Sequence, residues 1–98
     1  PRKDSPIHYG VAKAALSQLT KELAVRFADN GVQVNCIAYG GVEGRADEQF
    51  KQRYSKMVPM GRMLCEDEIV WPLEALLSKK SGPMTGQTLN FDGGWTIW

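Results

Sequence analysis

The chain has 98 residues, a formal net charge of +1 at pH 7, 43% hydrophobic residues and 23% charged residues. This length allows at most one small domain, and the balance of residues is that of a folded protein, not a disordered one. No basic run or mixed basic and aromatic patch is present, which argues against a nucleic-acid partner. No apolar stretch reaches the length of a membrane span and no signal peptide opens the chain, so we expect a cytoplasmic protein that meets no membrane.

The two cysteines, Cys36 and Cys65, are too few and too far apart for a metal motif or a disulfide framework. We therefore expect inert thiols in a reducing compartment and no metal site. The chain begins at Pro1 without an initiator Met, which suggests a piece of a longer protein.

A polar loop over residues 1–5 leads into the first predicted element. Ser5-Pro6 combines an N-cap serine with a proline at the first helical position. Apolar residues then recur at helical spacing, and Asn30-Gly31 is a stop signal. We predict one helix over residues 6–30, along which these apolar residues recur: Ala12, Leu16, Leu19, Leu23 and Phe27.

Tyr9 and Lys13 lie four residues apart at the start of this helix, so their side chains share one face. The lysine cation would favour the ionised form of the phenol, and such a tyrosine can act as a general acid or base. Tyrosine and lysine also meet at this spacing on many surface helices, which is the simpler explanation of the pair taken alone.

Residues 32–38 are rich in β-branched side chains and nearly continuous in apolar character. After a helix, this pattern predicts a buried strand of a parallel sheet. Tyr39-Gly40-Gly41 breaks the strand at its carboxyl end, where open α/β sheets bind their ligands. The two glycines either let the backbone approach a ligand or form a flexible turn.

Residues 43–63 combine a short amphipathic helix with a segment punctuated by proline and glycine. Phe50, Tyr54 and Met57 recur on one face of the helix, and residues 58–63 follow it. A segment of this kind after a ligand-binding strand is either a lid over the site or a connection that covers the core.

The remaining elements are a helix and a last strand. Residues 66–78 begin with acidic side chains and present an apolar face, while Pro72 predicts a kink or a helix split in two. Residues 85–91 alternate as a strand does. Trp95 and Trp98 place two indoles near the C-terminus, which suggests a contact surface, for example with another subunit.

The succession of motifs over residues 6–95 closely resembles the C-terminal half of the short-chain dehydrogenase/reductase family. In chain order the motifs are Tyr-x-x-x-Lys, Val-Asn-Cys-Ile-Ala, a glycine break, Pro-Met-Gly-Arg-Met and Thr-Gly-Gln-Thr-Leu-Asn-Phe-Asp-Gly-Gly. The resemblance implies an α/β fold in which residues 1–98 are the C-terminal part of one doubly wound, Rossmann-like parallel sheet. The glycine-rich dinucleotide half would be absent from these residues.

The resemblance also implies roles for individual residues. Tyr9 would be the proton donor and acceptor when a hydride passes between a nicotinamide and a carbonyl or alcohol carbon. Lys13 would stabilise the phenolate of Tyr9 and hydrogen-bond the nicotinamide ribose. Residues 43–63 correspond to the substrate-covering region of the family.

Tyr39-Gly40-Gly41-Val42 stands where the family usually has Pro-Gly-x-Val, whose backbone flanks the nicotinamide carboxamide. The resemblance therefore places all four residues at the cofactor, together with Tyr9 and Lys13. Tyr39 replaces the usual Pro, and Gly44 falls where the family often has a Thr that hydrogen-bonds the cofactor.

We thus expect an oxidoreductase that uses NAD or NADP on a small carbonyl or alcohol substrate and forms a homodimer or homotetramer, as the family does. Gly-Gly-Val-Glu-Gly and the C-terminal Asp-Gly-Gly-Trp resemble family members of bacterial surface-sugar pathways, such as acylneuraminate or flagellin modification. This suggests a sugar derivative as substrate.

The alternative is a non-catalytic fragment or interaction module that cannot bind a dinucleotide alone. The family's phosphate loop, its Asn-Ala-Gly strand and its catalytic Ser all precede the Tyr, and only eight residues precede Tyr9 here. Pyrophosphate is held at the helix N-terminus of the first βα turn, which these residues lack. The residue that selects NAD or NADP would also lie before Pro1.

Overall fold

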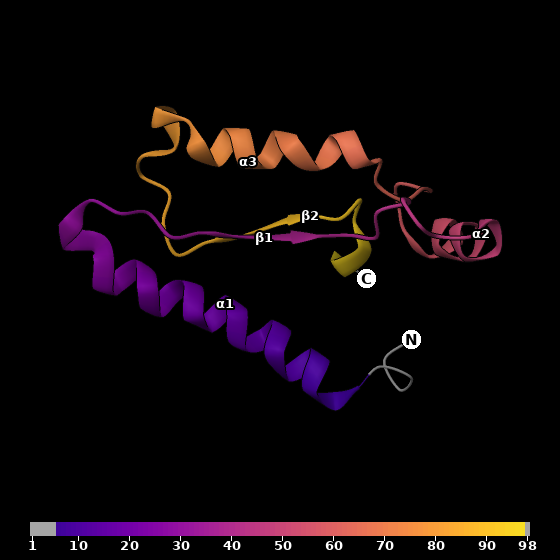
Figure 1. The fold of residues 1–98 in the computed structure, drawn as a ribbon, viewed down its shortest axis with the longest axis horizontal. Coiled ribbons are helices and arrows are strands. Elements are labelled where there is room, and N and C mark those ends of the chain that lie inside the picture. The colour runs from indigo at the N-terminus through magenta and orange to yellow at the C-terminus, as the bar shows by residue number, and fades with distance from the viewer. Residues whose placement is uncertain (1–5, 98) are drawn as a thin grey trace. The chain divides into compact units, whose positions relative to one another are not determined.

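The computed structural model describes residues 6–97. Its main elements are three α-helices and two strands, drawn in Figure 1: α1 (Ile7–Phe27), β1 (Cys36–Tyr39), α2 (Glu48–Met57), α3 (Val70–Leu77) and β2 (Thr88–Phe91). Short 3₁₀ turns lie at Ala28–Asn30, Glu66–Ile69, Lys79–Ser81 and Trp95–Ile97. Within residues 6–97, no helix is both long enough and apolar enough to cross a bilayer.

The chain divides into two compact units. The first is the chain up to Cys36 together with Gly82–Thr88, and the second is Ile37–Ser81 together with Leu89–Trp98. Both strands begin in the first unit and continue into the second. The first unit therefore contains α1, and the second contains α2, α3 and the carboxyl ends of the strands.

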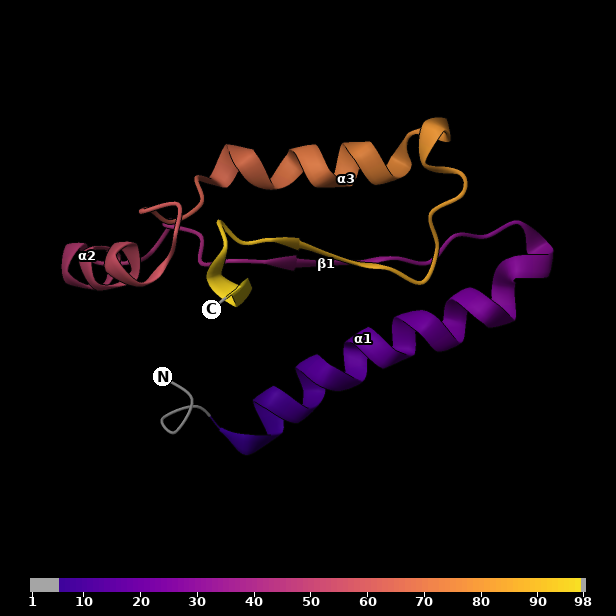
Figure 2. The ribbon, with the colours of Figure 1, turned by 180° about the vertical axis from the view of Figure 1, so that it is seen from behind.

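β1 and β2 form a two-stranded parallel sheet. The Cys36 N–H donates to the Gln87 carbonyl at 2.9 Å, and the Gly40 N–H donates to the Phe91 carbonyl at 3.0 Å. Donor and acceptor both advance by four residues between these two bonds, which is the register of a parallel pair. In both Figure 1 and Figure 2 the strands point toward α2, which follows the carboxyl end of β1.

Both strands are shorter than the predicted ranges 32–38 and 85–91. Before β1, side chains make bonds that a backbone ladder would otherwise make. The Asn35 amide donates to the Met84 carbonyl at 2.9 Å and accepts the Gln87 N–H at 3.1 Å. The β-branched pattern therefore marks an extended segment, of which only the last part is paired as a strand.

The predicted helix over residues 6–30 forms as α1 and the 3₁₀ turn that follows it. Pro6 is the N-cap, and Gly31 ends the turn with a φ of +69°, where glycine is favoured. The predicted N-cap Ser5 lies outside the described residues.

The recurring apolar side chains of α1 are not buried within residues 6–97. Among the described residues of α1, only Thr20 and Ala24 are buried, whereas Leu16 and Leu19 are about half exposed. The helical periodicity identifies an apolar face of α1 but does not say what covers that face.

The predicted helix over residues 66–78 is split in two, as Pro72 suggested. A 3₁₀ turn over Glu66–Ile69 leads directly into α3. Pro72 is the third residue of α3, and in the first turn of a helix its missing N–H removes no helical hydrogen bond. The proline is fully buried, so it contributes to the core and does not kink the helix interior.

Candidate active site

Tyr9 and Lys13 meet on α1 as their spacing predicts. The Lys13 Nζ lies 5.4 Å from the centroid of the Tyr9 ring, within the range of a cation–π contact. Tyr9 is 55% exposed, so its phenol is accessible from solvent. The pair belongs to the first unit, while Tyr39–Val42 belong to the second.

The turn that follows β1 is held by hydrogen bonds on Gly41. The Gly41 N–H donates to the Tyr54 hydroxyl at 2.7 Å, and its carbonyl accepts the Leu64 N–H at 2.8 Å. The Leu64 carbonyl in turn accepts the Glu43 N–H at 2.9 Å. Val42 lies between these bonds, and its own N–H and C=O have no hydrogen-bond partner among residues 6–97.

Gly40 and Gly41 are required by close packing within the second unit. A Cβ on Gly40 would lie 2.9 Å from the Asp92 Cα, and one on Gly41 would lie 2.8 Å from the Tyr54 Cε2. Distances this short are prohibitive for a side chain. Of the two alternatives raised by the glycine pair, a flexible turn does not fit, because the turn is clamped on both sides.

The side chain of Tyr39 contacts the start of α3. Its hydroxyl donates to the Ile69 carbonyl, and its ring packs edge-on against Phe91 with centroids 6.2 Å apart. If the 3₁₀ helix continued, the Ile69 carbonyl would accept the N–H of residue 72. Residue 72 is Pro72, which has no N–H to donate. The tyrosine that replaces the usual proline of the motif is therefore anchored through its side chain.

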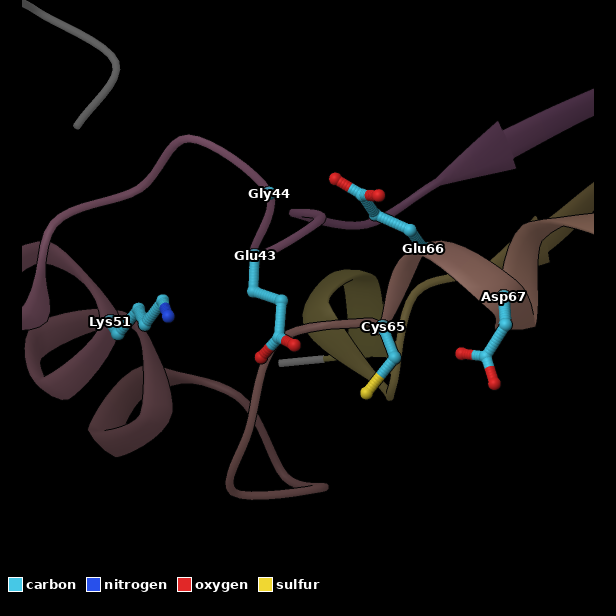
Figure 3. A pocket seen from close by; sticks show the side chains of 6 residues that line it. All are labelled: Glu43, Gly44, Lys51, Cys65, Glu66 and Asp67. Carbon is cyan, nitrogen blue, oxygen red and sulfur yellow. The ribbon is translucent and has the colours of Figure 1, made fainter.

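A shallow hollow of about 400 Å³ is lined partly by the predicted substrate-covering region, residues 43–63, and partly by residues 65–67, which follow it. Figure 3 shows the side chains that line it, from the loop after β1, from α2 and from the 3₁₀ turn before α3: Glu43, Gly44, Lys51, Cys65, Glu66 and Asp67. Glu66 Oε1 lies 2.8 Å from where a Cβ of Gly44 would be. A side chain at this position would meet the exposed end of the Glu66 side chain, which can move aside, so the packing does not explain why glycine stands in the place of the family's Thr.

The thiol of Cys65 lines this hollow. Burial raises the pKa of Cys65, and the negative charges of Glu43 and Glu68 raise it further. A raised pKa lowers the share of the reactive thiolate, so the surroundings of Cys65 do not activate it as a nucleophile.

Arg62 and Glu68 fix the segment that connects α2 with α3. Arg62 donates to both carboxylate oxygens of Glu68, at 2.6 and 3.1 Å, and Glu68 Oε1 also accepts the Cys65 N–H at 2.8 Å. The hydrogen bonds from Arg62 and Cys65 lower the pKa of Glu68 to about 2. This bidentate pair explains the Arg of the Pro-Met-Gly-Arg-Met motif as a structural residue.

Acid is expected to weaken the fold through Glu68. A glutamate ionises near pH 4.3 in an unfolded chain and near pH 2 here, so its stabilising effect is complete above about pH 4.5 and is lost as the pH falls toward about 2. Glu68→Gln should lower the melting temperature at pH 7 and flatten its decline between about pH 4 and 2. Thermal unfolding followed by circular dichroism checks this.

The control for the acid experiment is Glu74→Gln, at an exposed position of α3. It should leave both the melting temperature at pH 7 and its decline in acid unchanged. Because Arg62 and Glu68 are partly exposed, high salt should reduce the difference between wild type and Glu68→Gln. An acid profile of Glu68→Gln identical to that of wild type would contradict the assignment.

Sequence reasoning missed the role of Tyr54, which it placed only on an apolar helix face. The hydroxyl that accepts the Gly41 N–H gives no signal in the sequence, because residues 41 and 54 meet only in the folded second unit. The Glu68 contact had a weak signal, since a glutamate three residues after an N-cap position is the pattern of a capping box.

Comparison with known proteins gives consistent matches over nearly the whole chain. A family model described as Enoyl-(Acyl carrier protein) reductase matches residues 3–96. The chain is 33% identical over 96 residues to 3beta-hydroxysteroid dehydrogenase 1 of Eggerthella lenta, covering 92% of this chain and 37% of that protein. It is 35% identical over 93 residues to post-translational flagellin modification protein A of Campylobacter coli, covering 95% of this chain and 36% of that protein.

A crystal structure of a short-chain dehydrogenase from Leptospira borgpetersenii with bound NAD+ superimposes with a TM-score of 0.89 and 40% sequence identity. The superposition covers 95% of this chain and 37% of that one. The chain thus spans well under half the length of the relatives that it matches. Its family match, sequence identities and structural likeness agree: the chain belongs to the short-chain dehydrogenase/reductase family of oxidoreductases.

Proposed function

We propose that these residues are the C-terminal part of an NAD(P)-dependent dehydrogenase or reductase with a doubly wound sheet. The observation that supports this most directly is the Tyr9–Lys13 pair, in which an exposed phenol lies beside a cation in a chain of this family. In the proposed reaction Tyr9 gives its proton to a carbonyl oxygen, or takes one from an alcohol, and Lys13 stabilises the phenolate. The bound nicotinamide supplies or accepts the hydride.

The turn after β1, residues 39–42, has backbone groups that could hydrogen-bond a nicotinamide carboxamide. A primary carboxamide presents a carbonyl acceptor and an NH₂ donor, and Val42 offers an N–H and a C=O that have no other partner in the described chain. Gly41, by contrast, has its N–H and C=O bonded to Tyr54 and Leu64. In this proposal Tyr39, Gly40 and Gly41 shape the turn, and Val42 makes the hydrogen bonds to the cofactor.

The proposed substrate is a small carbonyl or alcohol compound, with a sugar derivative as the first class to test. The sugar proposal is supported by the sequence resemblance and by the 35% identity to flagellin modification protein A. A steroid alcohol is the natural comparison compound, because a 3beta-hydroxysteroid dehydrogenase is 33% identical. We also propose that the full-length protein is a homodimer or homotetramer.

The proposal is tested by titrating the full-length protein and the 98-residue chain with NADH and NADPH while following fluorescence. We expect the full-length protein to bind at least one dinucleotide and the 98-residue chain to bind neither at millimolar concentration. The reason is that pyrophosphate needs the first βα turn of the fold, which the 98 residues lack.

Two results would contradict parts of this proposal. Tight binding by the 98-residue chain alone would show that the upstream half is not needed. Failure of the full-length protein to bind either dinucleotide would favour the alternative, a non-catalytic interaction module.

A further inference from the structure

Tyr54 lies where three parts of the second unit meet. It is carried by α2, whose N-cap Asp47 accepts the Phe50 N–H at 2.7 Å. The half-buried Tyr54 ring stacks on Trp95, with centroids 4.7 Å apart and planes 9° apart, and its centroid lies 6.2 Å from that of Phe50. Its hydroxyl reaches the turn after β1 and accepts the Gly41 N–H.

Both the ring and the hydroxyl of Tyr54 fix the turn. The hydroxyl oxygen lies 2.7 Å from the Gly41 nitrogen, and the ring lies so close to Gly41 that no Cβ could be placed between them. On its other side, the turn packs at Gly40 against the backbone of Asp92. The Gly41 peptide is therefore held from two directions, and Tyr54 is the side chain on one of them.

Trp95, on which Tyr54 stacks, is itself held by a hydrogen-bonded turn. The Asp92 carboxylate accepts the Gly94 N–H at 2.9 Å and the Thr96 hydroxyl at 2.9 Å. Burial alone would raise the pKa of Asp92, but the hydrogen bonds from Gly94 and Thr96 outweigh it and leave the pKa below its usual value. The ionised carboxylate thus keeps the turn, and with it the indole, in place.

The consequence concerns the next residue. Tyr54 holds the Gly40–Gly41 peptide, and Leu64 bonds the carbonyl of Gly41 and the N–H of Glu43 on the two peptides that flank Val42. Tyr54 and Leu64 together therefore hold the turn that presents the Val42 N–H and C=O. We propose that Tyr54 is a positioning residue, which through its hydroxyl on Gly41 and its stack on Trp95 holds Val42 ready to bind the carboxamide of the cofactor. This rests on the proposed function, in which Val42 makes that contact. Tyr54 does not itself touch the cofactor in this proposal.

The test is Tyr54→Phe in the full-length protein, which keeps the ring and its stack and removes the acceptor of the Gly41 N–H. We expect the dissociation constant for the dinucleotide that wild type binds to rise by a factor of up to about ten, the limit reached if the whole free energy of this hydrogen bond holds the turn in its binding conformation. Trp95→Leu removes the stack and leaves the hydroxyl, and should weaken binding by a smaller factor. Phe50→Leu, on the same face of α2 without a hydrogen bond to the turn, is the matched control and should bind as wild type does.

A purely structural role would give a different pattern. If Tyr54→Phe lowers the melting temperature but leaves the dissociation constant unchanged well below that temperature, the proposal is overturned. Amide exchange of Gly41, measured by NMR, supplies a readout independent of binding and should be faster in Tyr54→Phe. If wild type binds no dinucleotide, the proposed function fails and the positioning role fails with it. If wild type binds a dinucleotide but Gly41 exchange is unchanged in Tyr54→Phe, the positioning role alone is overturned.

Discussion

Tyr9→Phe in the full-length protein is expected to lower the turnover number by about 100-fold or more, the usual contribution of a general acid or base. The ring and its contact with Lys13 are retained, so only the hydroxyl group, with its exchangeable proton, is lost. Tyr9 is more than half exposed, and the substitution should therefore leave the melting temperature and the affinity for NADH or NADPH nearly unchanged. Steady-state kinetics with the substrate found among sugar and steroid alcohols provides the measurement.

Lys13→Ala completes this experiment, because it should weaken both turnover and dinucleotide affinity. Lys21→Ala, at an exposed lysine on the same helix, is the matched control and should change neither. Turnover of Tyr9→Phe equal to that of wild type would rule out the proposed role of the phenol. Loss of neither property in Lys13→Ala would instead assign Lys13 to an ordinary solvated face.

Gly40→Ala is expected to destabilise the protein by about 2–3 kcal/mol, near the upper end for an overpacked site. The added Cβ would lie 2.9 Å from the Asp92 Cα and 3.1 Å from the Asp92 carbonyl oxygen, and neither backbone atom can move without separating the ends of the strands. Urea unfolding of the full-length protein measures the change.

Gly10→Ala is the control for this substitution and should have the opposite sign. Gly10 lies inside α1, and a Cβ there meets nothing within 4 Å. Alanine in place of a helical glycine should stabilise the protein by about 0.5–1 kcal/mol. A Gly40→Ala variant as stable as wild type would mean that the turn is pliable, which contradicts the clamp formed by Asp92 and Tyr54.

The elements of the fold were accessible from the sequence because each has a local cause. The helical spacing, Gly31 and Pro72 together predicted α1, its end and the split before α3. The burial of α1 could not be predicted from the sequence, since helical periodicity identifies an apolar face but not what covers it. The strand ends were also misjudged, because Asn35 replaces backbone pairing by side-chain bonds that β-propensity does not register.

The candidate site could be predicted from the sequence only where its residues are close to one another in the chain. Tyr9 and Lys13 meet because four residues separate them on a helix, and family resemblance supplied the role that spacing alone did not. Tyr54 and Glu66 reach Gly41 and Gly44 from distant parts of the chain. Their positions depend on tertiary packing, which no local pattern encodes.

The one-sided pairing of β1 has a consequence for handling this polypeptide. Within residues 6–97, β1 pairs with a strand on one side only. The backbone N–H and C=O groups of alternate residues along β1 therefore point to an unpaired edge of the sheet. Such an edge recruits other chains and promotes aggregation. Multimers formed by the 98-residue chain in isolation would therefore reflect pairing of exposed edge strands. The physiological oligomeric state must be measured on the full-length protein.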